Sequence, residues 1–180
     1  MSPLRVAAVR GLAALTLVAV TAPDTPAQRI PEAEVKAALI RRFPEFVEWP
    51  ASAPPSPAPL TLCFSPSHAF GSVLPQLNKG PEIRGRAVVI RELRKGDHSG
   101  GCHVLYVAPA DQDLLQRALT LPILTVGDQV DFCPLGGVVN LRVIGGRVRF
   151  EINLTRARRV GLTVDSQLLR LASRLYGGHP

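Results

Sequence analysis

The sequence lacks the short motifs that mark the common catalytic and nucleotide-binding sites. It contains no GxSxG nucleophile elbow, no Walker A phosphate loop, no GxGxxG fingerprint and no HExxH zinc helix. The acidic residues are spread singly along the chain, so no pair of carboxylates is evident for general acid and base catalysis. These absences favour a protein that is not an enzyme and that needs no cofactor.

Metal-ligating residues are also few, with three cysteines and four histidines in the whole chain. No CxxC pair or cluster of histidines has the spacing of a zinc site, so we expect no metal. Cys102 and His103 are neighbours on an expected strand, where adjacent side chains point to opposite faces and cannot form a nucleophile and base dyad. Asp97, His98 and Ser99 resemble a triad only in linear order, and the glycines around them indicate a surface loop.

Charged residues are scarce as well, at 19% of the chain against 46% hydrophobic residues. This balance excludes the composition of a disordered chain, and 180 residues suit one domain together with a targeting segment. Basic residues outnumber acidic residues by 21 to 14. The arginines are scattered, without a concentrated run or interleaved aromatic residues, which disfavours nucleic acid and favours an acidic partner or a membrane surface.

The chain has an uncharged run at Gly11–Pro23, preceded by Arg5 and Arg10, and no later segment resembles a membrane span. A spanning helix needs about 20 apolar residues, so this run is too short and predicts a cleavable secretory signal. A buried N-terminal helix or a retained anchor is the alternative. We therefore divide the chain into a signal peptide at residues 1–27 and one domain at residues 28–180. Export also disfavours a nucleic-acid partner, and removal of the signal leaves a net charge of +6.

Short β-rich runs alternate with helical patterns in the first two thirds of the mature chain. A helix with apolar residues at three-to-four spacing is expected over residues 32–49, with a kink or restart near Glu45 because Pro44 interrupts it. Five prolines between Pro50 and Pro59 predict a loop. The β-rich runs are residues 60–64, 87–90, 102–108 and 123–126, and the helical patterns are residues 67–77 and 111–121. This alternation predicts an α/β three-layer sandwich with a mostly parallel sheet and helices on both faces.

A β-hairpin follows, in which Gly145 and Gly146 form a two-residue turn between residues 138–144 and 147–154. That turn pairs Val143 with Val148, and the apolar side chains of both strands then share one face. The opposite face would place Arg142 against Arg149, Asn140 against Glu151 and Val138 against Asn153.

Two arginines directly opposed on a sheet are unfavourable unless a negative group lies nearby. Glu151 could compensate them diagonally, or solvent could screen them, since exposed charges contribute little. Alternatively, the polar face of the hairpin recognises an anionic ligand or an acidic surface. The candidate ligand-binding or partner-binding residues are therefore Asn140, Arg142, Arg149, Glu151 and Asn153.

The C-terminal segment predicts two helices, at residues 156–160 and 165–176, separated by Gly161 and with Asp165 as the N-cap of the second. The apolar residues of the second helix are expected to pack, with Arg170 and Arg174 pointing outward. These apolar residues are Leu168, Leu169, Leu171, Ala172 and Leu175.

Three cysteines in an exported chain suggest one disulfide and one unpaired thiol, but the sequence does not choose among the three possible pairings. A bond between Cys63 and Cys102 would close a loop of about 40 residues and stabilise the fold by about 4 kcal/mol in the chain-entropy model. Cys63 lies late in its expected strand and Cys102 opens its own, so this pairing needs an offset between the strands. Alternatively, both are small buried hydrophobic residues, and Cys133 is a loop thiol.

Five segments together resemble the YfiR family in order and spacing, and they cover most of the mature chain. They are KAALIRRFPEFVEWP at 36–50, PLTLCFSPSHAFG at 59–71, GCHVLYVAP at 101–109, ILTVGDQVDFCPLGGVVNL at 123–141 and RVRFEINLTRARRVGLTVDSQLLRLA at 147–172.

The resemblance implies a periplasmic α/β protein similar to non-enzymatic repressors that bind the periplasmic sensor domain of an inner-membrane diguanylate cyclase. It implies a disulfide between Cys63 and Cys102, onto which the family's two characteristic cysteines map. The resemblance also implies a second cysteine pair in the typical member of the family. This chain retains only Cys133 near the first cysteine of that pair and has Asn140 near the position of the second. Redox-sensitive repression and a homodimer are hypotheses from the resemblance. A small-ligand-binding accessory protein of a periplasmic transporter or sensor kinase is the alternative with the same fold.

Overall fold

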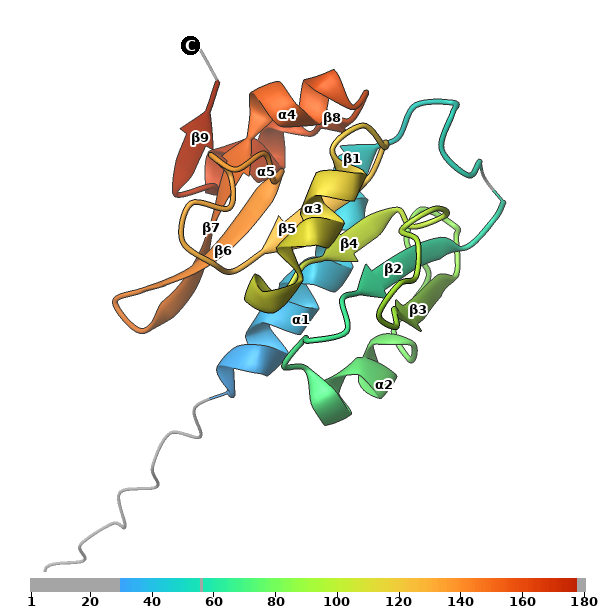
Figure 1. Cartoon of the computed structure of the whole chain (residues 1–180), viewed down its shortest axis with the longest axis horizontal. Coiled ribbons are helices and arrows are strands. Elements are labelled where there is room, and N and C mark those ends of the chain that lie inside the picture. The colour runs from blue at the N-terminus through green and yellow to red at the C-terminus, as the bar shows by residue number, and fades with distance from the viewer. Residues whose placement is uncertain (1–29, 56, 178–180) are drawn as a thin grey trace, which may run out of the picture.

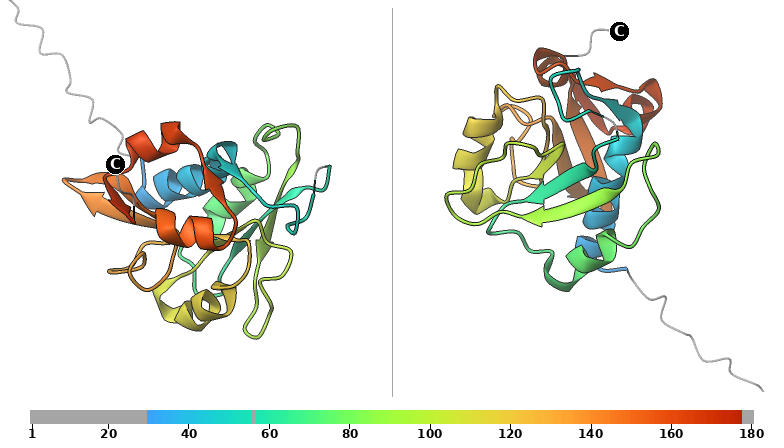
Figure 2. Two further views of the ribbon diagram at one scale, coloured as in Figure 1. Left: turned by 90° about the horizontal axis from the view of Figure 1, so that it is seen from above. Right: turned by 90° about the vertical axis from the view of Figure 1, so that its right-hand side faces the viewer.

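The structure is a computed structural model that describes residues 30–55 and 57–177. The predicted signal peptide lies outside these residues. A seven-stranded sheet in the order β3-β2-β4-β5-β6-β7-β9 forms the centre of the molecule, with α1 on one face and α3 on the other (Figures 1 and 2). The predicted α/β sandwich is confirmed. The strands are β2 (Leu60–Phe64), β3 (Val88–Glu92), β4 (Val104–Tyr106), β5 (Leu124–Gly127), β6 (Val139–Ile144), β7 (Arg147–Asn153) and β9 (Arg174–Tyr176).

Helices and 3₁₀ turns connect the strands, and most are shorter than the sequence patterns predict. The helices are α1 (Glu32–Arg42), α2 (Leu74–Leu77), α3 (Gln112–Ala118), α4 (Leu154–Arg159) and α5 (Ser166–Leu171). The 3₁₀ turns are η1 (Phe43–Phe46), η2 (Gly71–Val73) and η3 (Pro109–Asp111). A separate two-stranded sheet pairs β1 (Val47–Glu48) with β8 (Thr163–Val164).

Strands β3, β2, β4, β5 and β6 run parallel, and the hairpin partner β7 is antiparallel to β6. The chain first places β3 on one side of β2 and then returns to place β4 on the other side. The strand order therefore reverses at the carboxyl ends of β2 and β4, which is where open α/β sheets usually bind ligands.

The sheet separates two hydrophobic cores because successive side chains of a strand point to opposite faces. Leu62 and Phe64 face the larger core, which α1, α2, α4 and α5 help to form. Cys63 faces the smaller core, where it joins Leu105 of β4 and Leu115 of α3. Since the parallel strands are buried on both faces, their sequences are nearly continuous apolar runs.

The first helix ends earlier than predicted. It stops at Arg42, because Pro44 has no N–H to continue the hydrogen bonds of the helix, and a 3₁₀ turn that begins at Phe43 follows instead of a second helical segment. The chain then extends as β1, where Val47 pairs with Val164 of β8. The FVEWP segment is therefore extended at its end and lies beside the C-terminal part of the chain.

The predicted hairpin register is confirmed. Arg142 pairs with Arg149 and Val143 with Val148 across β6 and β7. The turn residues Gly145 and Gly146 have φ values of 57° and 70°, in the left-handed region that glycine adopts without strain and that a type I′ turn requires.

The predicted C-terminal helix is partly wrong. Asp165 caps α5 as predicted, since its carboxylate accepts a hydrogen bond of 2.7 Å from the N–H of Gln167. The helix ends at Leu171, and residues Arg174–Tyr176 form β9, parallel to β7. Leu171 at the end of α5 is 66% exposed and Leu175 of β9 is 41% exposed, so these leucines do not pack as predicted.

The double glycine before β6 makes room for Phe132, which is fully buried in the smaller core. A methyl group on Gly127 or on Gly137 would overlap the Phe132 ring. Gly136 has a φ of 105°, which disfavours any residue with a side chain. The loop between β5 and β6 thus depends on small residues on both sides of one aromatic ring.

Substitution of Gly137 by alanine is expected to lower the free energy of unfolding by about 1–3 kcal/mol, the usual cost of overpacking a buried site. Urea denaturation of G137A and wild type measures the difference. G100A is the matched control, since a methyl group there meets no atom within 4 Å. Equal loss of stability in both variants would contradict the role of Phe132.

Candidate functional site

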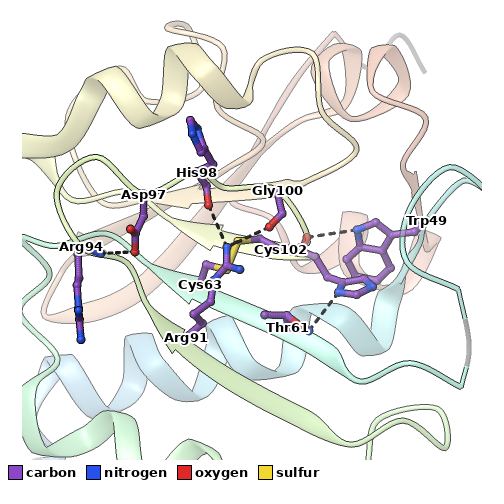
Figure 3. The surroundings of a disulfide bond; sticks show 10 residues. Trp49, Thr61, Cys63, Arg91, Arg94, Asp97, His98, Gly100 and Cys102 are labelled. Carbon is purple, nitrogen blue, oxygen red and sulfur yellow. Dashed lines mark hydrogen bonds between the residues drawn. A yellow bond between two sulfur atoms is a disulfide. The ribbon is translucent and has the colours of Figure 1, made fainter.

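Cys63 and Cys102 form a disulfide bond with a Cα–Cα distance of 5.8 Å (Figure 3). This agrees with the pairing that the family resemblance implies. Cys102 does not open a strand as expected but precedes β4, where Gly101 at φ 79° turns the chain back toward β2. The turn supplies the offset that the pairing needs.

Arg91 holds the segment that carries Cys102 (Figure 3). Its Nη2 lies 3.1 Å from the carbonyl oxygens of His98 and Gly100 and 3.1 Å from the Sγ of Cys102. One guanidinium on edge strand β3 therefore links the surface loop to the disulfide.

Cys133 is a free and fully buried thiol. Burial, with the negative charge of Glu151 adding to it, raises the pKa of Cys133 to about 12. A thiol reacts through its thiolate, so this cysteine is inert in the folded protein.

Thiol titration is expected to give no reactive thiol in the native oxidised protein, one after unfolding and three after unfolding and reduction. The first value follows from the burial and raised pKa of Cys133, and the increase follows from the disulfide. Ellman's reagent measures all three, with C133S as the control that loses only the thiol released by unfolding. Three thiols before reduction would contradict the disulfide.

His103 is buried and its ring is held on both sides. Its Nδ1 accepts a 3.1 Å hydrogen bond from the N–H of Thr61, so the neutral ring keeps its proton on Nε2. Nε2 lies 3.1 Å from the carbonyl oxygen of Pro54, to which it donates, and 2.9 Å from Nη2 of Arg86, which has no acceptor to offer and meets this N–H as a second donor. Burial lowers the pKa of His103, and the positive charge of Arg86 lowers it further against the hydrogen bond to Pro54. Trp49 of the FVEWP segment donates its indole N–H to the carbonyl of His103 at 3.2 Å (Figure 3).

The free energy of unfolding is expected to fall as the pH is lowered from neutrality through 6.5, the ordinary histidine pKa. In this window the unfolded chain binds a proton at His103 that the folded protein does not, until the pH reaches the lower pKa of the native state. Urea denaturation from pH 7.5 to pH 5.5 measures the slope, which should be smaller in H103Q. Parallel curves for the two proteins would contradict this assignment.

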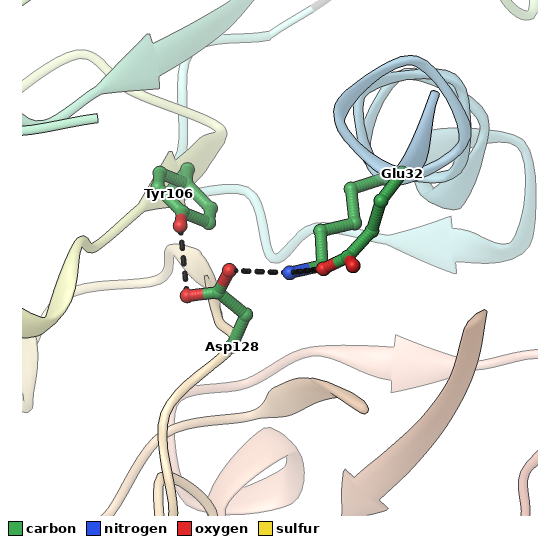
Figure 4. A network of polar contacts seen from close by, with 4 residues as sticks. Glu32, Tyr106 and Asp128 are labelled. Atoms are coloured by element: carbon green, nitrogen blue, oxygen red, sulfur yellow. Dashed lines mark hydrogen bonds and ion pairs between the residues drawn. The ribbon is translucent and has the colours of Figure 1, made fainter. Parts of the chain in front are cut away.

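A second polar network joins the start of α1 to the carboxyl ends of β4 and β5 (Figure 4). Asp128 accepts hydrogen bonds of 2.7 Å from the Lys36 ammonium and 2.8 Å from the Tyr106 hydroxyl, and Glu32 pairs with Lys36 at 2.5 Å. Burial opposes the charge on Lys36, but the hydrogen bonds to Asp128 and Glu32 raise its pKa above the ordinary value. Burial and the charge of Asp128 raise the pKa of Tyr106.

Neither Lys36 nor Tyr106 is therefore poised to transfer a proton near neutral pH, as a general acid or base would be. The network fixes α1 against the sheet. Within residues 30–55 and 57–177, no group of three or more His, Cys, Asp or Glu side chains is placed to hold a metal ion.

The structure divides the five candidate residues of the hairpin into two groups. Asn140 is completely buried, and its amide N–H donates to the Glu151 carboxylate at 3.4 Å. Asn153 caps α4 by accepting from the N–H of Arg156 at 2.9 Å and donates to the carbonyl of Cys133 at 2.8 Å. Asn140, Glu151 and Asn153 thus serve contacts within the protein.

Arg142 and Arg149 remain at the surface. Glu151 forms no ion pair with either arginine; its carboxylate accepts from Asn140 and from the Tyr176 hydroxyl at 3.3 Å, and its negative charge lies on the same face of the hairpin. Neither arginine side chain forms an ion pair or a hydrogen bond with the described part of the chain.

A hollow of about 380 Å³ lies at the reversal of strand order, a site that sequence reasoning missed. It is lined by Ser67 after β2, Arg94 and Lys95 after β3, and Asp111 and Arg117 near α3. Ser67 donates its N–H and hydroxyl to Asp111 at 2.8 and 3.0 Å, which joins the ends of β2 and β4. The signal in the sequence was weak, since these residues come from three separate segments.

Comparison with known proteins matches residues 33–173 to the YfiR/HmsC-like family model. The chain belongs to the YfiR/HmsC-like family. The crystal structure of a conserved domain protein from Vibrio cholerae O1 biovar El Tor strain N16961 is also similar, with 14% identity and a TM-score of 0.48. The similarity covers 80% of this chain and 60% of that one, so this chain spans about three fifths of that protein's length. No helix in the described part of this YfiR/HmsC-like chain is both long and apolar enough to cross a membrane.

Proposed function

We propose that this protein is an exported regulator that represses an inner-membrane diguanylate cyclase by binding its periplasmic sensor domain. The observation that carries the proposal is the family match over residues 33–173, because the YfiR/HmsC-like family is regulatory rather than catalytic at the family level.

The proposal includes export by a signal peptide at residues 1–27 and action in the periplasm as one domain at residues 28–180. The Cys63–Cys102 disulfide supports this location, since disulfides persist in oxidising compartments. In the proposal, reduction of this bond would relieve repression, and the protein would act as a homodimer.

A small-ligand-binding accessory protein of a transporter or sensor kinase is the second candidate, and the hollow at the reversal of strand order favours it. Arg94 and Lys95 lie at this hollow without an acidic partner among the described side chains, as an anionic ligand would require. A transporter or receptor operon around the gene would support this candidate, and an adjacent cyclase with a periplasmic domain would support the first.

Deletion of the gene is expected to raise cellular cyclic di-GMP, because the cyclase loses its repressor. Mass spectrometry of nucleotide extracts measures the change. The full chain should restore the low level, whereas a chain that begins at Gln28 after a new start codon should not, because it would remain in the cytoplasm. An unchanged cyclic di-GMP level in the deletion strain would refute the repressor role.

A further inference from the structure

We propose that the β6–β7 hairpin is the docking element of this protein, and that it binds an acidic surface with an apolar centre on the extracytoplasmic part of a membrane protein. The inference rests on the proposed function, which supplies a membrane partner but no contact surface. The hairpin projects from the body of the molecule beyond α1 and α3 (Figures 1 and 2).

One face of the hairpin is basic. Register places Arg142, Arg147 and Arg149 on this face, together with Arg174 of the neighbouring strand β9. Arg147, Arg149 and Arg174 are exposed and Arg142 is partly exposed. Arg174 lies over the Tyr176 ring, 5.3 Å from its centroid, whereas the other three have no ion pair or hydrogen bond with the part of the chain that the structure describes.

This arrangement is unfavourable in the isolated protein. Like charges directly opposed on a sheet repel each other, and Arg142 and Arg149 are a direct cross-strand pair. Glu151 offsets part of this repulsion from the same face, but its carboxylate is bonded to Asn140 and Tyr176 and forms no ion pair with Arg142 or Arg149. An acidic partner would relieve the repulsion, and guanidinium groups suit carboxylates because they can bind them with two hydrogen bonds.

The tip of the hairpin is apolar. Val143 is 49% exposed and Ile144 is 52% exposed, on opposite faces of β6. A hollow of about 360 Å³ lies on the Val143 face and is lined by Val148 of β7 and by Ile30 and Val35 at the start of the described chain. Ile144 thus lies on the same face as the arginines, whereas Val143 and the hollow lie on the opposite face, and the tip joins the two. Exposed apolar residues beside charged ones, as at Ile144, are typical of the centre and rim of a protein interface.

A protein surface fits the tip better than a lipid surface. Segments that insert into the membrane interface usually carry tryptophan or other aromatic residues. The turn and its flanking residues, Val143–Val148, contain none.

The test uses the mature protein as bait for detergent-solubilised membranes of the source organism, with quantitative mass spectrometry of the retained proteins. We expect R147E/R149E to retain about tenfold less of the partner than wild type, because both charges at the rim are reversed. K79E/R170E is the matched control, with the same change in net charge at two exposed positions after α2 and on α5, and should bind as wild type does. V143S/I144S should also lose binding, whereas circular dichroism should show all variants folded.

The possible outcomes separate this inference from the repressor role. A cyclase retained equally by wild type and R147E/R149E would overturn the hairpin surface and leave the repressor role intact. If wild type retains a membrane protein other than a cyclase, and R147E/R149E does not retain it, the hairpin surface is supported and the role in cyclase repression is overturned. If wild type retains no membrane protein, both the hairpin surface and the repressor role are rejected. If wild type but not R147E/R149E binds phosphatidylglycerol vesicles that contain no protein, the partner of the hairpin is a lipid surface and the protein partner is rejected.

Discussion

The pairing of β2 with β4 is the interaction on which the rest of the structure depends. The two parallel strands lie side by side although 39 residues separate Cys63 from Cys102, and three different contacts hold them. At the amino end, His103 and Thr61 form a hydrogen bond through the imidazole ring. The disulfide joins the strands on the α3 face, and the Ser65 hydroxyl accepts from the N–H of Ala108 at 2.8 Å beyond their carboxyl ends.

Other parts of the molecule take their positions from this pair. Trp49 docks the FVEWP segment by its bond to the carbonyl of His103, and the extended chain just before it pairs with β8. Growth of the sheet from β4 through β5 then places the hairpin at the end opposite β3. The hairpin is thus a projection from a body that is cross-linked elsewhere, and its exposed residues can contact a partner without any change in the two cores.

The parts of the fold that the sequence predicted are those in which local chemistry decides the geometry. The turn at Gly145 and Gly146 allows essentially one register, and alternation then assigns every side chain of both strands to a face. Strand β9 was not predictable, because three residues carry no clear period and the strand exists only through its pairing with β7. The helix predicted for this segment does not form, because the pairing with β7 outweighs the local preference for a helix.

The candidate site also has features that the sequence predicted and features that it could not predict. Register placed Arg142 and Arg149 on one face, as the sequence predicted. Sequence reasoning could not show that Asn140 is buried, since that depends on the loop between β5 and β6. The hollow lined by Ser67 and Arg94 was also missed, because strand order and not local pattern brings its residues together.

The loop before β6 is fixed without a disulfide, although it carries the third cysteine of the chain. Here Cys133 stands alone, and its carbonyl accepts from Asn153 at 2.8 Å while Val138 donates its N–H to the Thr125 hydroxyl at 3.0 Å. With Phe132 packed between two glycines, these bonds hold the loop to the root of the hairpin without a covalent link. A reductant therefore has one disulfide to act on among the described residues, and it lies on β2 and before β4, with β5 between these strands and the hairpin. Reduction should act on the hairpin, the proposed docking element, only through the stability of the sheet that carries it.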